Sequence, residues 1–313
     1  MTNPQNFASK PLRMGAPARK FANMKRLVAI FLLTAGAAMA AGLPDSVVFV
    51  GRDRFQSLVS RGVAENWAAL PIGQRVATVG RALVGTPYMN FTLELDSRIE
   101  TPCVNMKGMD CWTFFEIALG TARALQQCPN PQPRDLLRMI ELDRYRGGKC
   151  DGKFTSRLHH LEDWLQDNQR RGLVKDITST LPGARKIYRE MDYMGGAASR
   201  LFRQLRAAPS MVPVMARIEQ SLSARGIYYV PKSSVPAAEK FLRDGDIICI
   251  VTTWHGDYTS HVGLAVRDAK GTLRFLHASK NSRAVIVDSR LSDYLNRYSL
   301  HAGIMVARPN DIP

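Results

Sequence analysis

Beyond its first 40 residues the sequence lacks any long apolar run, any internal repeat and any low-complexity tract. A membrane-spanning helix needs about 20 predominantly apolar residues in succession, so this absence argues against a membrane span in the mature chain. The sequence also lacks a His-Glu-x-x-His motif and any compact Cys/His spacing, which argues against the common zinc sites. What remains has the composition of an ordinary globular domain.

The first 40 residues have the pattern of a leader and signal peptide. The basic segment Met24-Lys25-Arg26 precedes 12 apolar residues, Leu27–Ala38, and the small-x-small cleavage site Ala38-Met39-Ala40. The apolar run is short for a bilayer span, which favours a cleaved signal over an uncleaved anchor. We expect translation to begin at Met24 and the mature protein to be exported to the periplasm or cell envelope.

Acidic residues are scarce. The chain has 27 Asp and Glu against 43 Lys and Arg, a net charge of +16. Residues 1–40 carry six of these basic residues and no acid, so the mature chain keeps a net charge of about +10. A basic protein outside the cytoplasm is better suited to anionic envelope material than to nucleic acid.

Cysteines are few and odd in number, namely Cys103, Cys111, Cys128, Cys150 and Cys249. In an oxidising compartment an odd count leaves at least one thiol unpaired. Cys249 lies in the apolar run Ile247–Val251, typical of a buried strand, whereas Cys103, Cys128 and Cys150 lie in loop-like contexts. We predict a Cys128–Cys150 disulfide, and the position of Cys111 then needs a separate reason.

Periodicity divides the remaining chain into a helical and a strand-rich part, which predicts an α+β fold with one domain over residues 44–313. Helical patterns cover residues 74–84, a stretch starting at Cys111, and residues 133–144, 156–171, 196–207, 211–225 and 236–242. About five short strands, an antiparallel meander, are expected at residues 247–253, 261–267, 273–279, 284–288 and 303–308.

Cys111 is predicted to lie in the first turn of a helix that Asp110 caps. A buried structural thiol, half of a disulfide and a nucleophile all fit that position. Unpaired backbone N–H groups and the helix dipole would lower the pKa of the thiol and could stabilise an oxyanion, although the charge of Asp110 opposes the first effect. A nucleophilic Cys111 therefore needs a histidine partner.

Two of the six histidines are placed for that role. In the segment Ser260–Val266 strand alternation puts His261 on the face opposite the apolar residues. If the next hairpin closes around Asp268–Lys270, His277 lies opposite His261 or one residue out of register. His277 could then accept a hydrogen bond from His261 Nδ1 and fix its tautomer. Together these features favour a nucleophilic Cys111 with His261 as base.

Several motifs in order along the chain resemble the bacterial N-acetylmuramoyl-L-alanine amidase-like family, within the NlpC-type papain-like superfamily of cell-wall hydrolases. The similarity extends from about residue 70 to Pro309. The motifs are Gly85–Tyr88, Met109–Glu116, Ser156–His160, Gly245–Ile248, Ser260–Gly263 and Leu276–Ser279.

The resemblance implies a papain-like fold with a helical part packed on the sheet. It implies that Cys111 is the nucleophile, that His261 is the base and that His277 orients it, with no cofactor and no metal. The substrate would be an amide of peptidoglycan or a muropeptide, either the MurNAc–L-Ala bond or a stem-peptide bond. By the same resemblance Tyr88, Ser156 and Arg157 are expected to contact it. Two departures are the bulky Trp112 and an additional helical stretch over residues 185–225.

Two other functions remain open on the sequence alone. A zinc amidase could use His255, Asp257, His261 and His277 as ligands. A protein that retained the fold but had lost catalysis could bind peptidoglycan through its basic surface. The sequence does not say which bond is cut, nor does it give the oligomeric state.

Overall fold

An eight-stranded antiparallel sheet forms the centre of the structure, a computed structural model that describes residues 43–312. The strand order is β4-β5-β10-β6-β7-β8-β9, and β3 also pairs with β10. The predicted leader over residues 1–40 lies outside the described residues. The strands are β3 (Val174–Asp176), β4 (Arg185–Ile187), β5 (Ile227–Pro231), β6 (Ile247–Thr252), β7 (Thr259–Arg267), β8 (Leu273–Ser279), β9 (Ala284–Arg290) and β10 (His301–Pro309).

The five predicted strands correspond to β6–β10, but the sheet is larger than predicted. Strands β6 to β9 form the expected meander, whereas β10 returns to pair with β6 on one side and with β5 on the other. The predicted helical stretch 185–225 is wrong at its start, because residues Arg185–Ile187 form β4 and pair with β5. These added strands are three to five residues long, too short to establish a period of two.

Helices supply the rest of the fold, and a two-residue parallel pair, β1 (Phe49–Val50) and β2 (Val104–Asn105), lies apart from the sheet. The helices are α1 (Asp45–Val48), α2 (Arg52–Ala64), α3 (Ile72–Ala82), α4 (Cys111–Gln127), α5 (Pro133–Arg144), α6 (Leu161–Arg170), α7 (Arg203–Ala207), α8 (Val212–Arg225), α9 (Val235–Ala238) and α10 (Leu291–Asn296). Within residues 43–312 none of them is long and apolar enough to cross a membrane.

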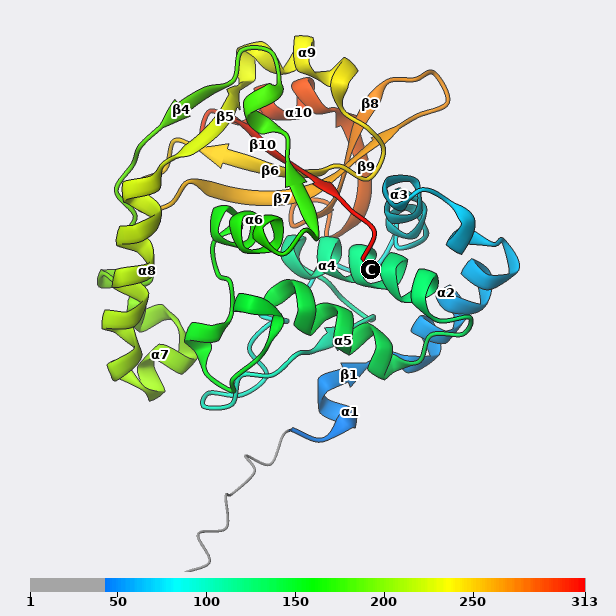
Figure 1. The fold of residues 1–313 in the computed structure, drawn as a ribbon, viewed down its shortest axis with the longest axis horizontal. Coiled ribbons are helices and arrows are strands. Elements are labelled where there is room, and N and C mark those ends of the chain that lie inside the picture. The colour runs from blue at the N-terminus through cyan, green and yellow to red at the C-terminus, as the bar shows by residue number, and fades with distance from the viewer. Residues whose placement is uncertain (1–42, 313) are drawn as a thin grey trace, which may run out of the picture. The chain divides into compact units, whose positions relative to one another are not determined.

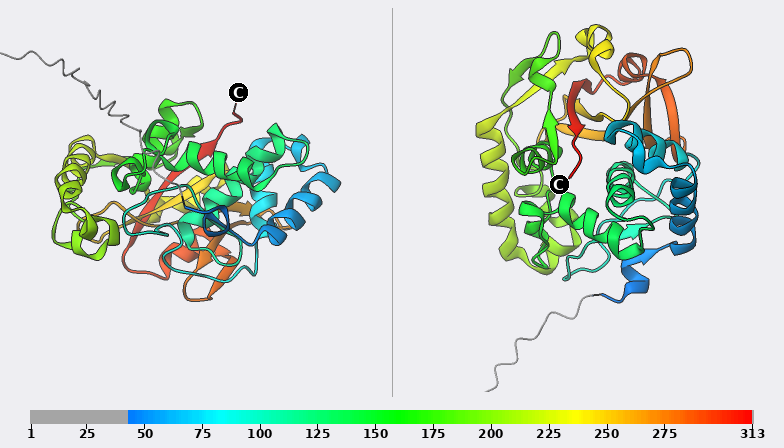
Figure 2. Two further views of the ribbon diagram at one scale, coloured as in Figure 1. Left: turned by 90° about the horizontal axis from the view of Figure 1, so that it is seen from below. Right: turned by 45° about the vertical axis from the view of Figure 1, so that its right-hand side comes forward.

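A separate apolar core covers each face of the sheet, so β6 and β7 are buried on both sides. Ile247, Cys249 and Val251 of β6 face the larger core, which includes residues of α3 and α4. Ile248 and Ile250 face a second core with residues of α9 and α10. Figures 1 and 2 show α4 on one side of the central strands and α9 and α10 on the other. The start of α4 therefore meets the sheet at β7 and β8.

Helix α4 is anchored by an ion pair with no solvent exposure. Glu116 accepts hydrogen bonds from Arg144 Nε at 2.9 Å and from Trp112 Nε1 at 2.7 Å, and the Glu116 and Arg144 side chains are both fully buried. One turn separates Glu116 from the start of the helix at Cys111. The pair thus fixes how the first turn of α4 is held against α5.

The predicted Cys128–Cys150 disulfide is absent, and within residues 43–312 all five cysteines are free thiols. Cys128 ends α4, where its N–H donates to Ala124 O at 2.9 Å. Cys150 belongs to the loop after α5, and its Sγ donates to Glu100 O at 3.4 Å. Cys128 and Cys150 therefore make separate local hydrogen bonds and are not joined to each other. Cys249 is buried in β6, as its apolar surroundings predicted.

Removal of Glu116 should destabilise the protein strongly, because Arg144 would remain buried without its counter-charge. We expect Glu116→Leu to lower the free energy of unfolding by about 3–5 kcal/mol, measured by chemical denaturation. The double variant Glu116→Leu, Arg144→Leu is the control and should be markedly more stable than the single variant. If both variants lost the same stability, the ion pair would not be what holds α4.

Candidate active site

Cys111 is the first residue of α4, and Asp110 caps that helix as predicted. The Asp110 carboxylate accepts from Thr113 N at 2.8 Å, and Thr113 Oγ1 accepts from Asp110 N at 3.0 Å, a reciprocal capping box. The first backbone bond within the helix runs from Phe114 N to Asp110 O. The N–H groups of Cys111 and Trp112 precede that bond and lie at the positive end of the helix.

Three side chains from adjacent strands form a hydrogen-bonded relay. His261 Nε2 on β7 lies 2.7 Å from His277 Nδ1 on β8, and His277 Nε2 lies 3.3 Å from Asp288 Oδ2 on β9. His277 is 2% exposed. Arg297 contacts the other oxygen of Asp288. The relay thus passes from a half-buried histidine to an acidic group that a cation holds in place.

The register between β7 and β8 differs from the prediction, although the two histidines do meet. Leu264 pairs with Leu276, so continuing the ladder by one residue places Gly263 opposite His277. The turn is longer than expected, since Asp268 N bonds to Thr272 O. A Cβ on Gly263 would lie 2.8 Å from His277 Cβ. Glycine at this position lets the His277 ring reach diagonally to His261.

The acceptor at the end of the relay fixes the direction of its protons. An ionised Asp288 can only accept, so His277 Nε2 must carry the proton in that bond. Neutral His277 then accepts at Nδ1, which requires the proton of neutral His261 to be on Nε2. The lone pair of His261 is consequently on Nδ1. We had expected His261 to donate through Nδ1, and the structure places the opposite nitrogen in that bond.

Burial keeps both histidines neutral. It lowers the pKa of His261 well below its usual value, an effect that His277 and His301 reinforce. Burial also lowers the pKa of His277 to about 4, although the hydrogen bond that His277 donates to Asp288 acts in the opposite direction. A neutral His261 is the form that can accept a proton.

The Cys111 thiol is also neutral at rest, contrary to the effect expected of a helix start. Burial raises the pKa of Cys111 to about 12, and the charge of Asp110 acts in the same direction. The N–H groups of Val262, Trp112 and Cys111 itself lower it by less. Val262 follows His261 directly, so the thiol lies beside the strand that carries His261.

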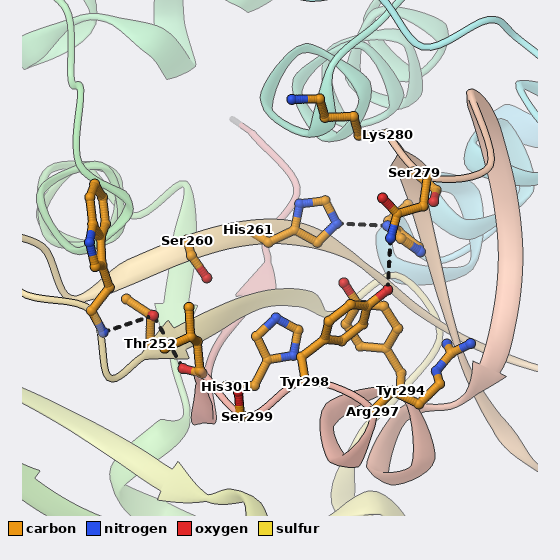
Figure 3. Close-up of a pocket in the computed structure, with 14 residues that line it drawn as sticks. Thr252, Ser260, His261, Ser279, Lys280, Tyr294, Arg297, Tyr298, Ser299 and His301 are labelled. Atoms are coloured by element: carbon orange, nitrogen blue, oxygen red, sulfur yellow. Dashed lines mark hydrogen bonds between the residues drawn. The ribbon is translucent and has the colours of Figure 1, made fainter.

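A cavity of about 540 Å³ opens next to the relay (Figure 3). His261, Tyr294, Tyr298 and His301 lie around it, and the rings of Tyr294 and His277 are 5.1 Å apart. Lys280 and Arg297 also line it and supply positive charge. Burial, and after it the neighbouring Tyr298 and Asp288, raise the pKa of Tyr294, so this phenol stays neutral beside the relay. Such a cavity suits a ligand with both apolar and anionic parts.

The three residues expected to contact substrate have different surroundings. Tyr88 lies near Cys111, because its backbone pairs with Met109, two residues before the cysteine. Burial first, and then Cys111 and Asp110, raise the pKa of Tyr88 to about 12. Arg157 lines a second cavity of about 190 Å³ together with Asp110 and Trp112, and it pairs with Glu94 at 3.3 Å. The Ser156 hydroxyl instead donates to Lys153 O at 2.8 Å within its own turn.

The residues considered as zinc ligands are not gathered at one point. His261 and His277 contact each other, His255 is exposed, and Asp257 lies 3.5 Å from His160. Asp257 therefore belongs to a different cluster, which includes Glu162. This arrangement does not bring His255, Asp257, His261 and His277 together as the ligands of one catalytic zinc ion.

The sequence analysis did not identify four residues of the site: Asp288, Tyr294, Arg297 and His301. Asp288 is the last residue of the predicted strand 284–288, and polar residues are common at strand ends, so its identity alone gave no indication of a role. The other three come from α10, the turn after it and the start of β10, a region where no helix was predicted. Asp288 could have been found only by predicting how β8 pairs with β9, because that pairing brings it next to His277.

Comparisons with known proteins identify relatives over most of the chain. The family model described as AmiA-like, N-acetylmuramoyl-L-alanine amidase-like, matches residues 78–304. The crystal structure of an N-acetylmuramoyl-L-alanine amidase from Bacteroides uniformis is similar, with 32% identity, a TM-score of 0.70 and coverage of 77% of this chain and 99% of that one.

Two further solved structures share the fold. A putative xylanase from Bacteroides fragilis has 37% identity and a TM-score of 0.66, over 73% of this chain and 98% of its own. A protein from Legionella pneumophila has 21% identity and a TM-score of 0.62, over 83% and 96% of the two chains. No curated protein sequence matches this chain.

Proposed function

Because the chain belongs to the AmiA-like, N-acetylmuramoyl-L-alanine amidase-like family, we propose that it is a cysteine-dependent amidase acting on peptidoglycan or muropeptides. The observation that carries the mechanism is the relay from His261 through His277 to Asp288, beside a helix that begins with Cys111. The bond would be MurNAc–L-Ala or an amide of the stem peptide.

The proposed reaction begins with two neutral groups. His261 Nδ1 takes the proton from Cys111 Sγ as the sulfur attacks the carbonyl carbon of the amide. The N–H groups of Cys111 and Trp112 at the helix start are the candidate donors to the oxyanion. The proton transfer from Cys111 to His261 thus accompanies the attack, so a free thiolate does not accumulate before the substrate carbonyl is bound.

The second half of the reaction returns the proton. Imidazolium His261 donates it to the leaving nitrogen, the C–N bond breaks, and an acyl-thioester remains on Cys111. Water then attacks the thioester, with His261 as base, and releases the carboxylic acid. Throughout, His277 and the negative charge of Asp288 stabilise the imidazolium and hold its ring.

The cavity supports an anionic, partly apolar substrate such as a muramyl peptide. Tyr294 and Tyr298 offer flat surfaces, while Lys280 and Arg297 can meet carboxylates. None of the residues that line it is acidic. Glycoside hydrolysis normally uses a pair of carboxyl groups, so this cavity does not favour the xylanase activity named for one relative.

We also propose an NlpC-type papain-like architecture and an envelope location. A cysteine at the start of a helix packed against histidine-bearing strands supports the first proposal. The basic start, apolar run and cleavage site within residues 24–40 support the second. A protein of this kind would meet its substrate after export.

The direct test is digestion of defined muropeptides, with the products identified by mass spectrometry. The mature protein should release a product whose mass names the bond, and Cys111→Ser should reduce its rate by at least about a thousandfold. Cys249→Ser is the matched control and should retain activity. Equal turnover by wild type and Cys111→Ser would refute cysteine catalysis. Binding to sacculi without turnover by either form would favour a non-catalytic wall-binding protein.

Asp288 should act on the rate through the two histidines. We expect Asp288→Asn to lower kcat by about 100-fold, because the amide can donate to His277 Nε2 and so move the proton of His277 to Nδ1. KM should change little, because Asp288 does not line the cavity. Asp293→Asn, an exposed acid on α10, is the control and should keep the wild-type rate. A wild-type kcat in Asp288→Asn would mean that the relay ends at His277.

A further inference from the structure

A second group of ionisable side chains lies away from the relay, between α6, α8 and the loop before β7. His160, Glu162 and Asp257 each offer one ligand atom, and these atoms lie within 4.8 Å of one another. His160 is 1% exposed and Glu162 is 3% exposed. His160 Nδ1 lies 3.5 Å from Asp257 Oδ1. Solvent cannot readily stabilise the charge of Glu162, whereas the Asp257 side chain is 16% exposed and its Oδ1 accepts from Tyr258 N at 2.8 Å.

Several of these buried atoms lack hydrogen-bond partners within the described residues. They are both ring nitrogens of His160 and Oε1 of Glu162. Glu162 Oε2 accepts only a long bond, 3.3 Å, from Thr259 Oγ1. Carboxylate oxygens of Asp257 and Glu219 approach the two ring nitrogens at 3.5 and 3.3 Å without forming hydrogen bonds. Buried polar atoms are nearly always partnered, so these long contacts and the unpartnered Glu162 Oε1 point to an additional binding partner.

The neighbouring arginines do not supply that partner. Arg225 donates to the backbone oxygen of Glu162 at 3.1 Å, and Arg189 donates to the backbone oxygen of Asp257 at 2.7 Å. On the far side of the imidazole, Glu219 Oε1 lies 3.3 Å from His160 Nε2, and the Glu219 carboxylate is held in place by Met194 N and Gly195 N. The side facing Glu162 and Asp257 remains without a bonded cation.

We propose that His160, Glu162 and Asp257 bind one divalent metal ion. The donor set of one imidazole nitrogen and two carboxylate oxygens suits a first-row ion, and zinc best matches it. A zinc ion would bond to Nδ1 of neutral His160 and to one oxygen of each carboxylate, and a water molecule would take the fourth position of its tetrahedral shell. Glu219 would then orient the imidazole from the opposite nitrogen, as outer carboxylates do for metal-bound histidines.

The site would be structural rather than catalytic. His160 and Glu162 lie at the start of α6, and Asp257 lies in the loop that leads to Thr259, the first residue of β7. Glu219 brings α8 to the same place. A bound ion would therefore fasten the additional helical segment to the strand that carries His261. This role is independent of the amide bond the protein cuts.

The test is the metal content of the full mature chain, measured by elemental mass spectrometry after purification without chelator. Cys111→Ala serves as the background, so that zinc held by the proposed nucleophile is not counted. We expect about one zinc per chain, and we expect a chelator to lower the melting temperature and added zinc to restore it. Retention of another divalent ion at the same stoichiometry would equally support the site.

Two variants in that background locate the ion. Asp257→Asn should lower the retained zinc at least tenfold, whereas His255→Asn, which removes an exposed histidine from the same loop, should leave it unchanged. The measurement on the Cys111→Ala protein decides whether the ion is present even if Asp257→Asn does not fold. Less than about a tenth of an ion per chain, with a melting temperature that neither chelator nor zinc alters, would overturn the proposal. His160 would then be the cation that holds the two carboxylates.

Discussion

The hydrogen bond between His277 and Asp288 is the constraint on which the rest of the site depends. A carboxylate accepts and does not donate, so one ionised group at the end of the relay determines which nitrogen is protonated on both rings. Although burial opposes it, hydrogen bonds from the Ser289 amide, Arg297 and His277 keep the pKa of Asp288 below its usual value. Through two imidazoles this leaves the lone pair of His261 on Nδ1, the nitrogen that takes the thiol proton in the proposed mechanism.

Burial sets the starting state of the proposed reaction. It raises the pKa of Cys111 and lowers that of His261, so the resting pair carries no charge. The proposed envelope enzyme would gain from this arrangement, because a neutral thiol is less readily alkylated or oxidised than a thiolate. The cap at Asp110, the Glu116–Arg144 pair and the glycine at residue 263 are the structural conditions that hold the participating groups at their positions.

Local pattern was sufficient for the elements that carry the proposed nucleophile and base. Apolar periodicity and the Asp110 cap predicted α4, and alternation predicted β6 to β10. Pairings that depend on distant residues were not predictable in the same way. The return of β10 to β6, the short β4 and the contact of Asp288 with His277 all depend on strand register, and the turn between β7 and β8 is two residues longer than predicted. The pKa of Cys111 was misjudged because the helix start is visible in sequence and the burial around it is not.

The central claim, a relay that holds His261 neutral with its lone pair on Nδ1, can be measured directly. Nitrogen NMR of histidine-labelled protein at about pH 7 reports the protonation of each ring nitrogen, and His261→Gln and His277→Gln assign the signals. We predict neutral rings at residues 261 and 277, each protonated at Nε2 and unprotonated at Nδ1. A doubly protonated His261, or one protonated at Nδ1, would contradict the mechanism.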